Sequence, residues 1–579
     1  MSLSRRKLLG GIGAATAAGV VGVGLGMHGR KQPKLDLPVA AGSKPYNILL
    51  VTSDQEQGWS LLPQGLIDTH CPGRARLQHE SLSFSRALTP TPVCSTARAV
   101  LYTGQHSQNN GVWDNIPLPY APTLKRDAPT LGTLMGAAGY RTAYFGKWHL
   151  SRLYGHKHAA WTAEQVRDEI QSFGFDEVGT THELDGVLGG HRDDTDTTDR
   201  AVAFLQAQAG HEKPWFAAVN IVNPHDIMYF TSGPEMTATR KIHYPDDLAR
   251  PPQTALYQQD LGYPLPANFG PVDLSTRVPA ATEYALCDEI AMGQLPYDNE
   301  QVCREFVNYY YNCIRESDQH IVRLLDALDA SGQAGNTIVV FTADHGEMLG
   351  VHGLRGKGAL PYREAMQVPL LVRHPQFAAA ASTTALASHI DMAPTLLGLA
   401  GVPAETVKRE VPELVGRDLS GVILRRDTQA SRGEQDDGLL MHWTSFIYQD
   451  HVAALAFDEE RKKSGATSLL ALRKPQFRGL LSKRGQMRGV YDGRYKFVRY
   501  FAPTQHHTPR SWQELIARND LELYDTQEDP GETRNLAREP EAVRELVMTM
   551  NAKLNRLIER EVGSDDGHHL PGPGFLWRA

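Results

Sequence analysis

The sequence predicts an α/β fold in which a large, mostly parallel (mixed) central sheet is flanked by helices. Short and almost purely apolar runs, such as residues 47–53 and 337–342, are typical of parallel strands that are buried on both faces. Longer segments of helical character alternate with these runs, for example residues 299–330. The alternation fades after about residue 421, so a smaller C-terminal α+β domain with an antiparallel sheet is expected beyond it.

Length and composition restrict the classes of protein that this chain can represent. With 579 residues it can bury a large core, and its length favours two or more domains. Its net charge of -7 provides no basic face, so we expect no nucleic-acid partner. None of the cysteine spacings is that of a zinc site, and the odd number of cysteines leaves at least one thiol free. The five cysteines are Cys71, Cys94, Cys287, Cys303 and Cys313.

Residues 1–41 have the pattern of a twin-arginine export signal. Arg5 and Arg6 precede a Gly/Ala/Val-rich run over residues 10–27. This run is close to the length that spans a bilayer, so an uncleaved N-terminal anchor is the alternative. Its glycine content and mild hydrophobicity favour the export signal. We therefore expect a bacterial protein that the Tat (twin-arginine) machinery exports in folded form, periplasmic or secreted.

Within a first domain predicted over residues 45–425, polar side chains follow the strands. Asp54 follows the strand at residues 47–53, and sites of open α/β sheets lie at the carboxyl ends of their strands. Lys147 and His149 follow the next predicted strand. Being two residues apart, they share one face if the segment is extended, and such a pair suits an oxyanion.

Two later strands also end in polar side chains. The first of them leads to His225, and the second leads to Asp344 and His345. Together with Asp54, Asp344 and His345 supply hard, partly anionic donors of the kind that Ca²⁺, Mn²⁺ or Mg²⁺ bind. Lys357 stands in the glycine-rich loop that follows, where it can approach a bound anion.

Cys94 lies at the start of a predicted helix. Pro92 disfavours helix immediately before it, whereas the unbranched residues that follow favour helix up to Gly104. A helix N-terminus carries unpaired N–H groups and the positive end of the dipole, which suits an anion or an activated sulfur nucleophile. Arg98 lies one turn along the same face and points back toward Cys94. For a lone cysteine a buried structural role is the commoner interpretation. The other motifs therefore have to decide whether Cys94 is structural or functional.

The remaining segments frame this region. Residues 227–297 show little periodicity and are interpreted as a long insertion that shapes access to the site. His389 and Asp391 stand at the start of a helix and are interpreted as structural or capping groups. The other predicted elements are a helix at 130–138, strands at 140–145, 215–222 and 368–373, and, in a C-terminal domain at 426–579, a hairpin of strands 489–492 and 495–500, a strand at 521–525 and a helix at 540–561.

Taken together, these motifs resemble those of the sulfatase family, within the alkaline-phosphatase-like superfamily. The resemblance extends from Pro45 to about residue 526. Its pairing of Asp54-Gln55 with Asp344-His345 is similar to that of choline sulfatases and phosphonate monoester hydrolases. The motifs are CSTAR at residues 94–98 with LYTG at 101–104, GKWHL at 146–150, TADHGE at 342–347 and DMAPT at 391–395.

The resemblance implies hydrolysis of a sulfate ester of a small molecule or saccharide. In that family the cysteine at the position of Cys94 is oxidised to formylglycine (3-oxoalanine) by a formylglycine-generating enzyme. The hydrated aldehyde attacks sulfur, forms a covalent sulfate intermediate and releases the alcohol, and its second hydroxyl then expels sulfate. The family's cation is usually Ca²⁺, with Mn²⁺ or Mg²⁺ as alternatives. Carried over by motif, its ligands are Asp54, Cys94, Asp344 and His345.

The same resemblance assigns roles to the remaining polar residues. Arg98 and His149 hold and deprotonate the nucleophile. Lys147 and Lys357 bind the sulfate oxygens as these gain charge. His225 protonates the leaving alcohol.

Two residues depart from the usual pattern and keep alternatives open. Thr96 stands where the modification motif has Pro or Ala, so a non-catalytic protein that binds sulfate esters through an unmodified Cys94 is one alternative. Gln55 stands where many members have a second Asp. A phosphonate monoester hydrolase or phosphodiesterase with the same site is therefore the other alternative.

Overall fold

A computed structural model describes residues 34–43 and 45–570, except 117, 119, 154–159, 185, 244–249, 272, 274, 275, 359, 378, 426–436, 465–473, 475, 476 and 478. Most of the predicted export signal lies outside these residues. Among the helices that are described, none combines the length and the apolar character needed to cross a membrane.

The core of the molecule is an eight-stranded mixed sheet with the strand order β4-β3-β5-β1-β6-β7-β2-β8. Only β7 runs against its neighbours, so the predicted mostly parallel sheet is confirmed. β1 lies between β5 and β6 and is parallel to both. The strands are β1 (Asn47–Asp54), β2 (Leu82–Leu88), β3 (Arg141–Gly146), β4 (Glu177–Val178), β5 (Trp215–Pro224), β6 (Thr337–Ala343), β7 (Leu370–Arg373) and β8 (Ala381–Ser388).

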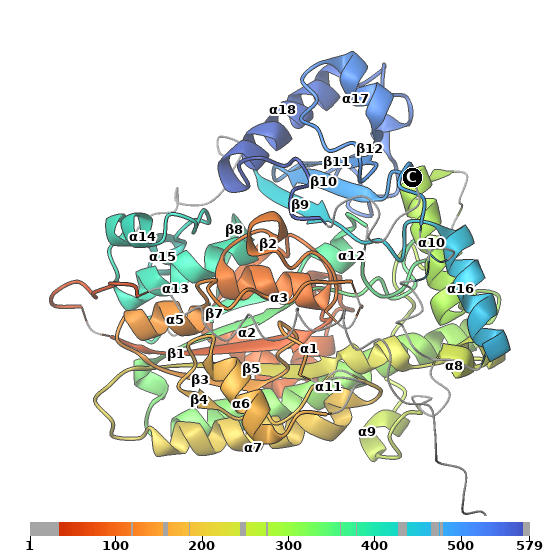
Figure 1. Cartoon of the computed structure of the whole chain (residues 1–579). Helices are drawn as coiled ribbons and strands as arrows, with labels where there is room; N and C mark the ends of the chain where they lie inside the picture. Colours follow the sequence, from red (N-terminus) through yellow and green to blue (C-terminus); the bar gives the residue numbers. More distant parts are fainter. Residues whose placement is uncertain are drawn as a thin grey trace, which may run out of the picture.

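Helices cover both faces of this sheet (Figure 1). The alternating side chains of β1 show why, because Ile48 and Leu50 pack into one apolar core while Leu49 and Val51 pack into another. The first core includes residues of α3 (Cys94–Thr103), α5 (Leu131–Ala137) and α13 (Met392–Ala400). The second includes residues of α2 (Pro72–Glu80), α7 (Gly189–Ala207) and α11 (Glu300–Ala330). A strand buried on both faces has no polar side, which explains its continuous apolar sequence.

A second, antiparallel sheet stands above the first in Figure 1, in the order β12-β11-β10-β9. The predicted hairpin at Gly493-Arg494 is confirmed, since Asp492 N–H donates to the carbonyl of Tyr495 at 3.1 Å. One face of this sheet packs against its own helices, and the other packs against the first domain around Val93, Leu354 and Tyr284. Its elements are β9 (Leu439–Trp443), β10 (Gln486–Tyr491), β11 (Tyr495–Phe501), β12 (Asp520–Asp525), α17 (Trp512–Arg518) and α18 (Arg544–Glu561).

The segment 227–297 is more regular than the sequence suggests. It contains α8 (Pro234–His243), α9 (Ala255–Gln258) and α10 (Pro279–Met292). Three of the seven buried residues of α10 are alanines and one is an aspartate, so its apolar stripe is faint in the sequence. Pro279 at the first helical position was the available signal. In Figure 1, α10 lies beside α16 (His451–Ser464) at the right of the molecule.

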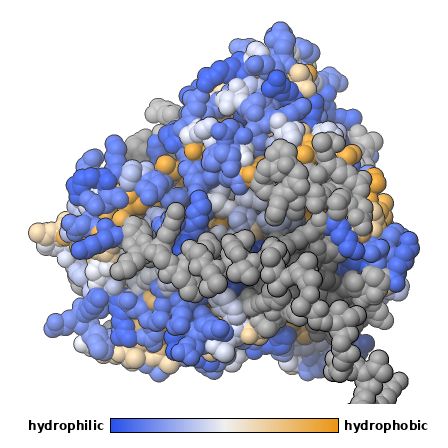
Figure 2. Space-filling model, viewed as in Figure 1, coloured by the Kyte–Doolittle hydropathy of each residue, from blue (hydrophilic) through white to orange (hydrophobic). Residues whose placement is uncertain are grey.

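The remaining elements are short, and the outer surface is polar. The described part of the face in Figure 2 is mainly hydrophilic, with scattered apolar areas. The short elements are η1 (Trp59–Leu61), α1 (Leu66–His70), α4 (Ser107–Asn110), α6 (Ala163–Gln171), η3 (His225–Tyr229), η5 (Ala334–Asn336), α12 (Arg363–Met366), η6 (His389–Asp391), α14 (Ala404–Glu410), α15 (Ser420–Ile423) and η10 (Leu536–Arg538).

Candidate active site

Cys94 is the first residue of α3, as the sequence predicts. Val93 before it is extended, with φ -143° and ψ 138°, and Gly104 ends the helix in the left-handed conformation. The backbone N–H of Ser95 is capped by Asn115 Oδ1 at 3.1 Å. The residue itself is only 1% exposed, so the sulfur atom lies inside the protein at a helix N-terminus.

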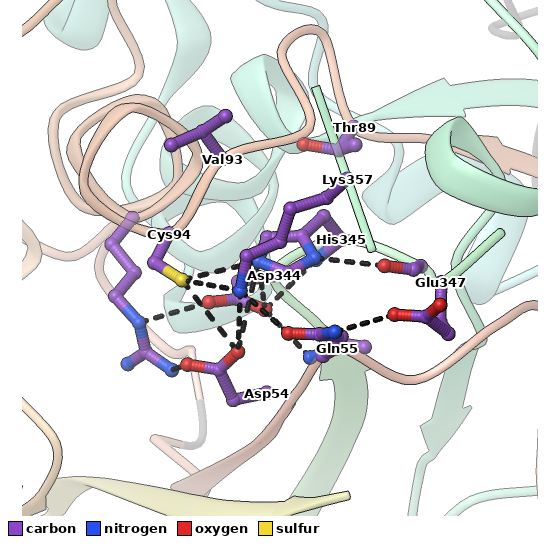
Figure 3. A network of polar contacts seen from close by, with 12 residues as sticks. Asp54, Gln55, Thr89, Val93, Cys94, Asp344, His345, Glu347 and Lys357 are labelled. Atoms are coloured by element: carbon purple, nitrogen blue, oxygen red, sulfur yellow. Dashed lines mark hydrogen bonds and ion pairs between the residues drawn. The ribbon is translucent and has the colours of Figure 1, made fainter. Parts of the chain in front are cut away.

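Three side chains form a buried cluster with this sulfur (Figure 3). One ligand atom from each of Asp54, Cys94, Asp344 and His345 lies within 4.8 Å of the others. The structure thus brings together the four residues that the family resemblance names as metal ligands. Two carboxylates and a neutral imidazole, beside the sulfur of Cys94, make a donor set that fits a divalent cation.

The protonation states of this cluster also suit a cation. Burial by itself would raise the pKa of Asp54, but Lys147, His225, Lys357 and Arg98 hold it well below its ordinary value, so the carboxyl is ionised. Burial lowers the pKa of His345 to about 4. Its ring is therefore neutral at pH 7, which is the form that binds metals.

The orientation of the His345 ring follows from one hydrogen bond. Nδ1 lies 2.9 Å from the carbonyl oxygen of Gly346, so it carries the proton and donates. This leaves the lone pair on Nε2, which lies 3.3 Å from Cys94 Sγ. The imidazole therefore presents its free nitrogen to the centre of the cluster.

Three cationic side chains surround the same carboxylates. Lys147 Nζ lies 2.8 Å from Asp54 Oδ2, and Lys357 Nζ lies 2.9 Å from Cys94 Sγ. Arg98 Nε donates to Asp344 Oδ2 at 3.0 Å. Burial would lower the pKa of Lys357, but Cys94 and Asp54 hold it above its usual range. The cluster therefore combines cation ligands with fixed positive charge, as an anionic substrate requires.

The two predicted histidines outside the cluster are both buried. His225 follows β5 and is near enough for its charge to lower the pKa of Asp54. His149 follows β3, but the segment is not the extended one that we expected. β3 ends at Gly146, and His149 has a positive φ of 58°. In this turn the buried Trp148 packs against Tyr144, with ring centroids 5.0 Å apart.

Two site residues were not assigned a role by the sequence motifs. Gln55 Oε1 accepts a hydrogen bond from Lys357 Nζ at 2.6 Å, and Gln55 Nε2 donates to Glu347. Glu347 also accepts from the backbone N–H of Gly356 at 2.7 Å. Gln55 stands out in the sequence as a departure from the usual second Asp, and Glu347 belongs to the motif at 342–347, but neither signal gives a role. Both help to set the position of the Lys357 side chain.

Other motif residues have structural roles. Asp391 accepts from the backbone N–H of Ser388 at 2.9 Å, so the capping role predicted for it is confirmed. Thr96 donates to the carbonyl of Val93 at 2.9 Å and lies 3.1 Å from the Thr91 hydroxyl. The hydroxyl at this unusual motif position therefore braces the turn that leads into α3. All five cysteines are free and buried, so the expectation of at least one free thiol is confirmed.

Comparison with known proteins identifies the family. The sulfatase family model matches residues 46–402, which is most of the chain. The chain belongs to the sulfatase family. It is a sulfuric ester hydrolase by that membership, and the recognition made from the motifs is confirmed.

Individual sulfatase relatives and neighbours agree with this assignment. The chain is 27% identical over 408 residues to an ulvan-active sulfatase from Formosa agariphila, an alignment that covers 67% of each protein. Its fold matches the 2-O GAG sulfatase BT1596 with a TM-score of 0.63 and 22% identity over 93% of this chain and 98% of that one. It also matches the phosphonate monoester hydrolase of Agrobacterium radiobacter with a TM-score of 0.54 and 21% identity over 88% and 96% of the two chains. The last two likenesses show the shared fold.

Proposed function

We propose that this sulfatase removes sulfate from a sulfated saccharide by the formylglycine route, with formylglycine made from Cys94 by a formylglycine-generating enzyme. The single observation that carries the proposal is the position of Cys94 Sγ. It lies at a helix N-terminus, within the four-donor cluster and 2.9 Å from Lys357 Nζ. Nucleophile, cation ligands and anion-binding charge are thus within reach of one sulfate group.

The metal in this proposal is Ca²⁺, with Mn²⁺ or Mg²⁺ as alternatives, and Asp54, Asp344, His345 and the modified Cys94 would hold it. When bound, the cation lowers the pKa of the nucleophile and neutralises charge on the sulfate oxygens. Removal of divalent cations with a chelator is expected to abolish activity, and adding back Ca²⁺, Mn²⁺ or Mg²⁺ separately identifies the preferred ion.

The side chains around the cluster have the remaining roles in catalysis. Lys147 and Lys357 bind the sulfate oxygens as their charge grows. Arg98 links Asp54 to Asp344 and holds the nucleophile, and His149 deprotonates it. His225 donates a proton to the oxygen of the leaving alcohol. Because all of these groups are buried, water competes little with them for the substrate.

The names of relatives support a saccharide substrate. One relative is an ulvan-active sulfatase, another is an N-acetylglucosamine-6-O-sulfatase, and one structural neighbour was solved with D-glucosamine-2-N,6-O-disulfate. We propose that the insertion at 227–297 shapes access for such a substrate. We also propose export by the Tat machinery, which places the enzyme in the periplasm or outside the cell, where polysaccharide fragments are met.

Mass spectrometry of the peptide Ala87–Arg98 tests the nucleophile. Protein made in the native host is expected to carry an aldehyde in place of the Cys94 thiol. Conversion in Thr96→Ala, which restores a usual motif residue, serves as the reference for complete modification. An unmodified thiol in active wild-type protein would overturn the formylglycine route, and an unmodified thiol in inactive protein would favour a sulfate-ester-binding role.

The Asp54-Gln55 pattern and the fold of the phosphonate monoester hydrolases favour one second candidate. A phosphonate monoester hydrolase or phosphodiesterase would use the same cluster, because sulfate and phosphate esters differ mainly in charge. Matched nitrophenyl sulfate, phosphonate and phosphodiester substrates distinguish the two. We expect the sulfate ester to be preferred in kcat/KM, and a preference of about a hundredfold for the phosphorus substrates, roughly 2.7 kcal/mol, would favour the second candidate.

A further inference from the structure

We infer that Tyr284, on helix α10 of the insertion, positions Lys357 in the active site. This inference rests on the proposed role of Lys357 in binding sulfate. Tyr284 touches none of the reacting atoms, so it is a positioning residue that acts through the lysine. The insertion would then set the geometry of catalysis in addition to shaping access.

The contact between the two residues is direct. The Tyr284 hydroxyl donates to the backbone carbonyl of Lys357 at 2.6 Å, and the ring is only 1% exposed. Gly358 packs against the same ring, because a Cβ added there would lie 2.3 Å from Tyr284 Cε2. The backbone on both sides of the peptide bond after Lys357 is therefore held by one tyrosine side chain.

A second anchor ties the same loop to the end of α10. Arg355 donates to the carbonyl oxygens of Met292 and Gly293, and lies 3.4 Å from Asp288. Arg355 is two residues before Lys357, so the loop is fixed to α10 at two points. Lys357 Nζ has hydrogen bonds at its far end to Cys94 and Gln55. A shift of the backbone would break these short contacts.

Helix α10 can act as a rigid support because it also forms ion pairs and a ring contact with residues outside the Lys357 loop. Glu283 forms ion pairs with Lys483 at 2.5 Å and with His451 at 2.8 Å, and Lys483 also bonds to Asp450 at 2.8 Å. These partners belong to the segment that contains α16. The Tyr284 ring packs on Tyr448 with centroids 4.9 Å apart. The position of Lys357 thus depends on α10 and, through α10, on residues that lie about 90 or more positions further along the chain.

The substitution Tyr284→Phe removes the hydroxyl and keeps the ring. We expect kcat to fall about tenfold with KM for an aryl sulfate nearly unchanged, because a displaced ammonium binds the charge that grows on the sulfate oxygens less well. Tyr140→Phe is the matched control. Tyr140 is equally buried and donates to the carbonyl of Tyr46 at 2.9 Å, far along the chain from Lys357. The Tyr140→Phe variant should lose about as much unfolding free energy as Tyr284→Phe but keep its activity.

A double-mutant cycle with Lys357→Ala tests whether Tyr284 acts through the lysine. We expect Lys357→Ala to lower kcat/KM about a hundredfold and Tyr284→Phe to have no further effect in that background. Arg355→Lys, which weakens the second anchor, should behave like Tyr284→Phe. Equal effects of Tyr284→Phe in both backgrounds would overturn the positioning role. Full activity of Lys357→Ala would instead overturn the role proposed for the lysine itself.

Discussion

The site combines opposite charges inside the protein, and each side chain depends on its neighbours. Asp54 lies within 4 Å of nitrogen atoms from Lys147, Arg98 and Lys357. An isolated carboxylate at 0% exposure would be very costly, so these cations are needed for its ionised state. The three fixed cations therefore offset the charge of the buried carboxylates.

His225 offers a residue-scale test of proton donation. In His225→Gln we expect kcat for a sugar or alkyl sulfate to fall by about 10²-fold or more, because a poor leaving alcohol needs a proton. The fall for a nitrophenyl sulfate should be less than about tenfold, since nitrophenolate leaves unaided. Steady-state kinetics on the two substrates measures the difference. Equal losses on both would show that His225 does not donate the proton.

His320 on α11 connects burial to pH-dependent stability. Burial lowers the pKa of His320 to about 4, and Arg323 adds to the effect. Below about pH 6.5 His320 binds a proton in the unfolded chain but stays neutral in the folded protein. The stability contributed by the neutral ring is therefore complete above pH 6.5 and is lost as the pH falls toward 4, by up to about 3 kcal/mol.

Denaturant unfolding at pH 7 and pH 4.5 measures this loss. His320→Gln should unfold with a smaller pH dependence than the wild type, whereas His211→Gln, at an exposed position, should leave the dependence as it is. If His320→Gln and His211→Gln behave alike, another group is responsible for acid sensitivity.

At the scale of elements, the ends of strands and the starts of helices position the side chains of the candidate active site. β3 ends at Gly146, whose φ is +89°, and the turn places Lys147 against Asp54. A Cβ on Gly146 would lie 2.0 Å from the carbonyl oxygen of Asn220 on β5. The close approach of the two strands at this point therefore requires glycine.

We expect Gly146→Ala to cost at least about 2 kcal/mol of unfolding free energy and to lower kcat/KM as well, because Lys147 moves with the strand end. Gly136→Ala in α5 is the matched control. Outside its chain neighbours and its own helix backbone, no atom of the described residues lies within 4 Å of a Cβ built at Gly136, so the change should be neutral or stabilising by up to about 1 kcal/mol. Chemical denaturation together with kinetics on both variants checks the prediction. A Gly146→Ala variant as stable as Gly136→Ala would contradict it.

At the scale of the whole molecule, buried polar contacts join the second sheet and the C-terminal residues to the first domain. His106, just before α4, lies 2.9 Å from Glu561 at the end of α18. Arg488 on β10 is fully buried and forms a two-pronged ion pair with Asp565 at 2.6 and 2.9 Å. The position of the second sheet is therefore specified by directional contacts as well as by apolar packing.

Asp565→Ala leaves the Arg488 charge buried without its carboxylate. We expect a loss of about 3 kcal/mol in unfolding free energy, seen as a lower denaturant midpoint. Asp566→Ala removes the neighbouring exposed carboxylate and should leave the midpoint unchanged. Similar midpoints for the two variants would show that the Arg488–Asp565 pair contributes no net stability.

Not all elements could be predicted from the pattern of the sequence. The strands β1, β5 and β6 were predicted nearly to the residue, since burial on both faces demands continuous apolar runs. β2 and β8 were missed because they mix polar with apolar residues in the outer part of the sheet. The roles of Gln55 and Glu347 were missed for a different reason. Isolated polar residues in loops form no recognisable sequence pattern. Their roles become apparent only when the structure shows their hydrogen-bond partners.

The sequence by itself determined the family and the mixed α/β class. It also predicted the residues proposed to carry the chemistry, because these stand at strand ends and at a helix start within the motifs of the family. Only the tertiary structure decided how these groups meet. Asp54, Cys94 and His345 come from segments separated by up to 291 positions, and their contacts depend on strand order. The support of Lys357 by Tyr284 likewise arises from the packing of α10, which no local pattern encodes.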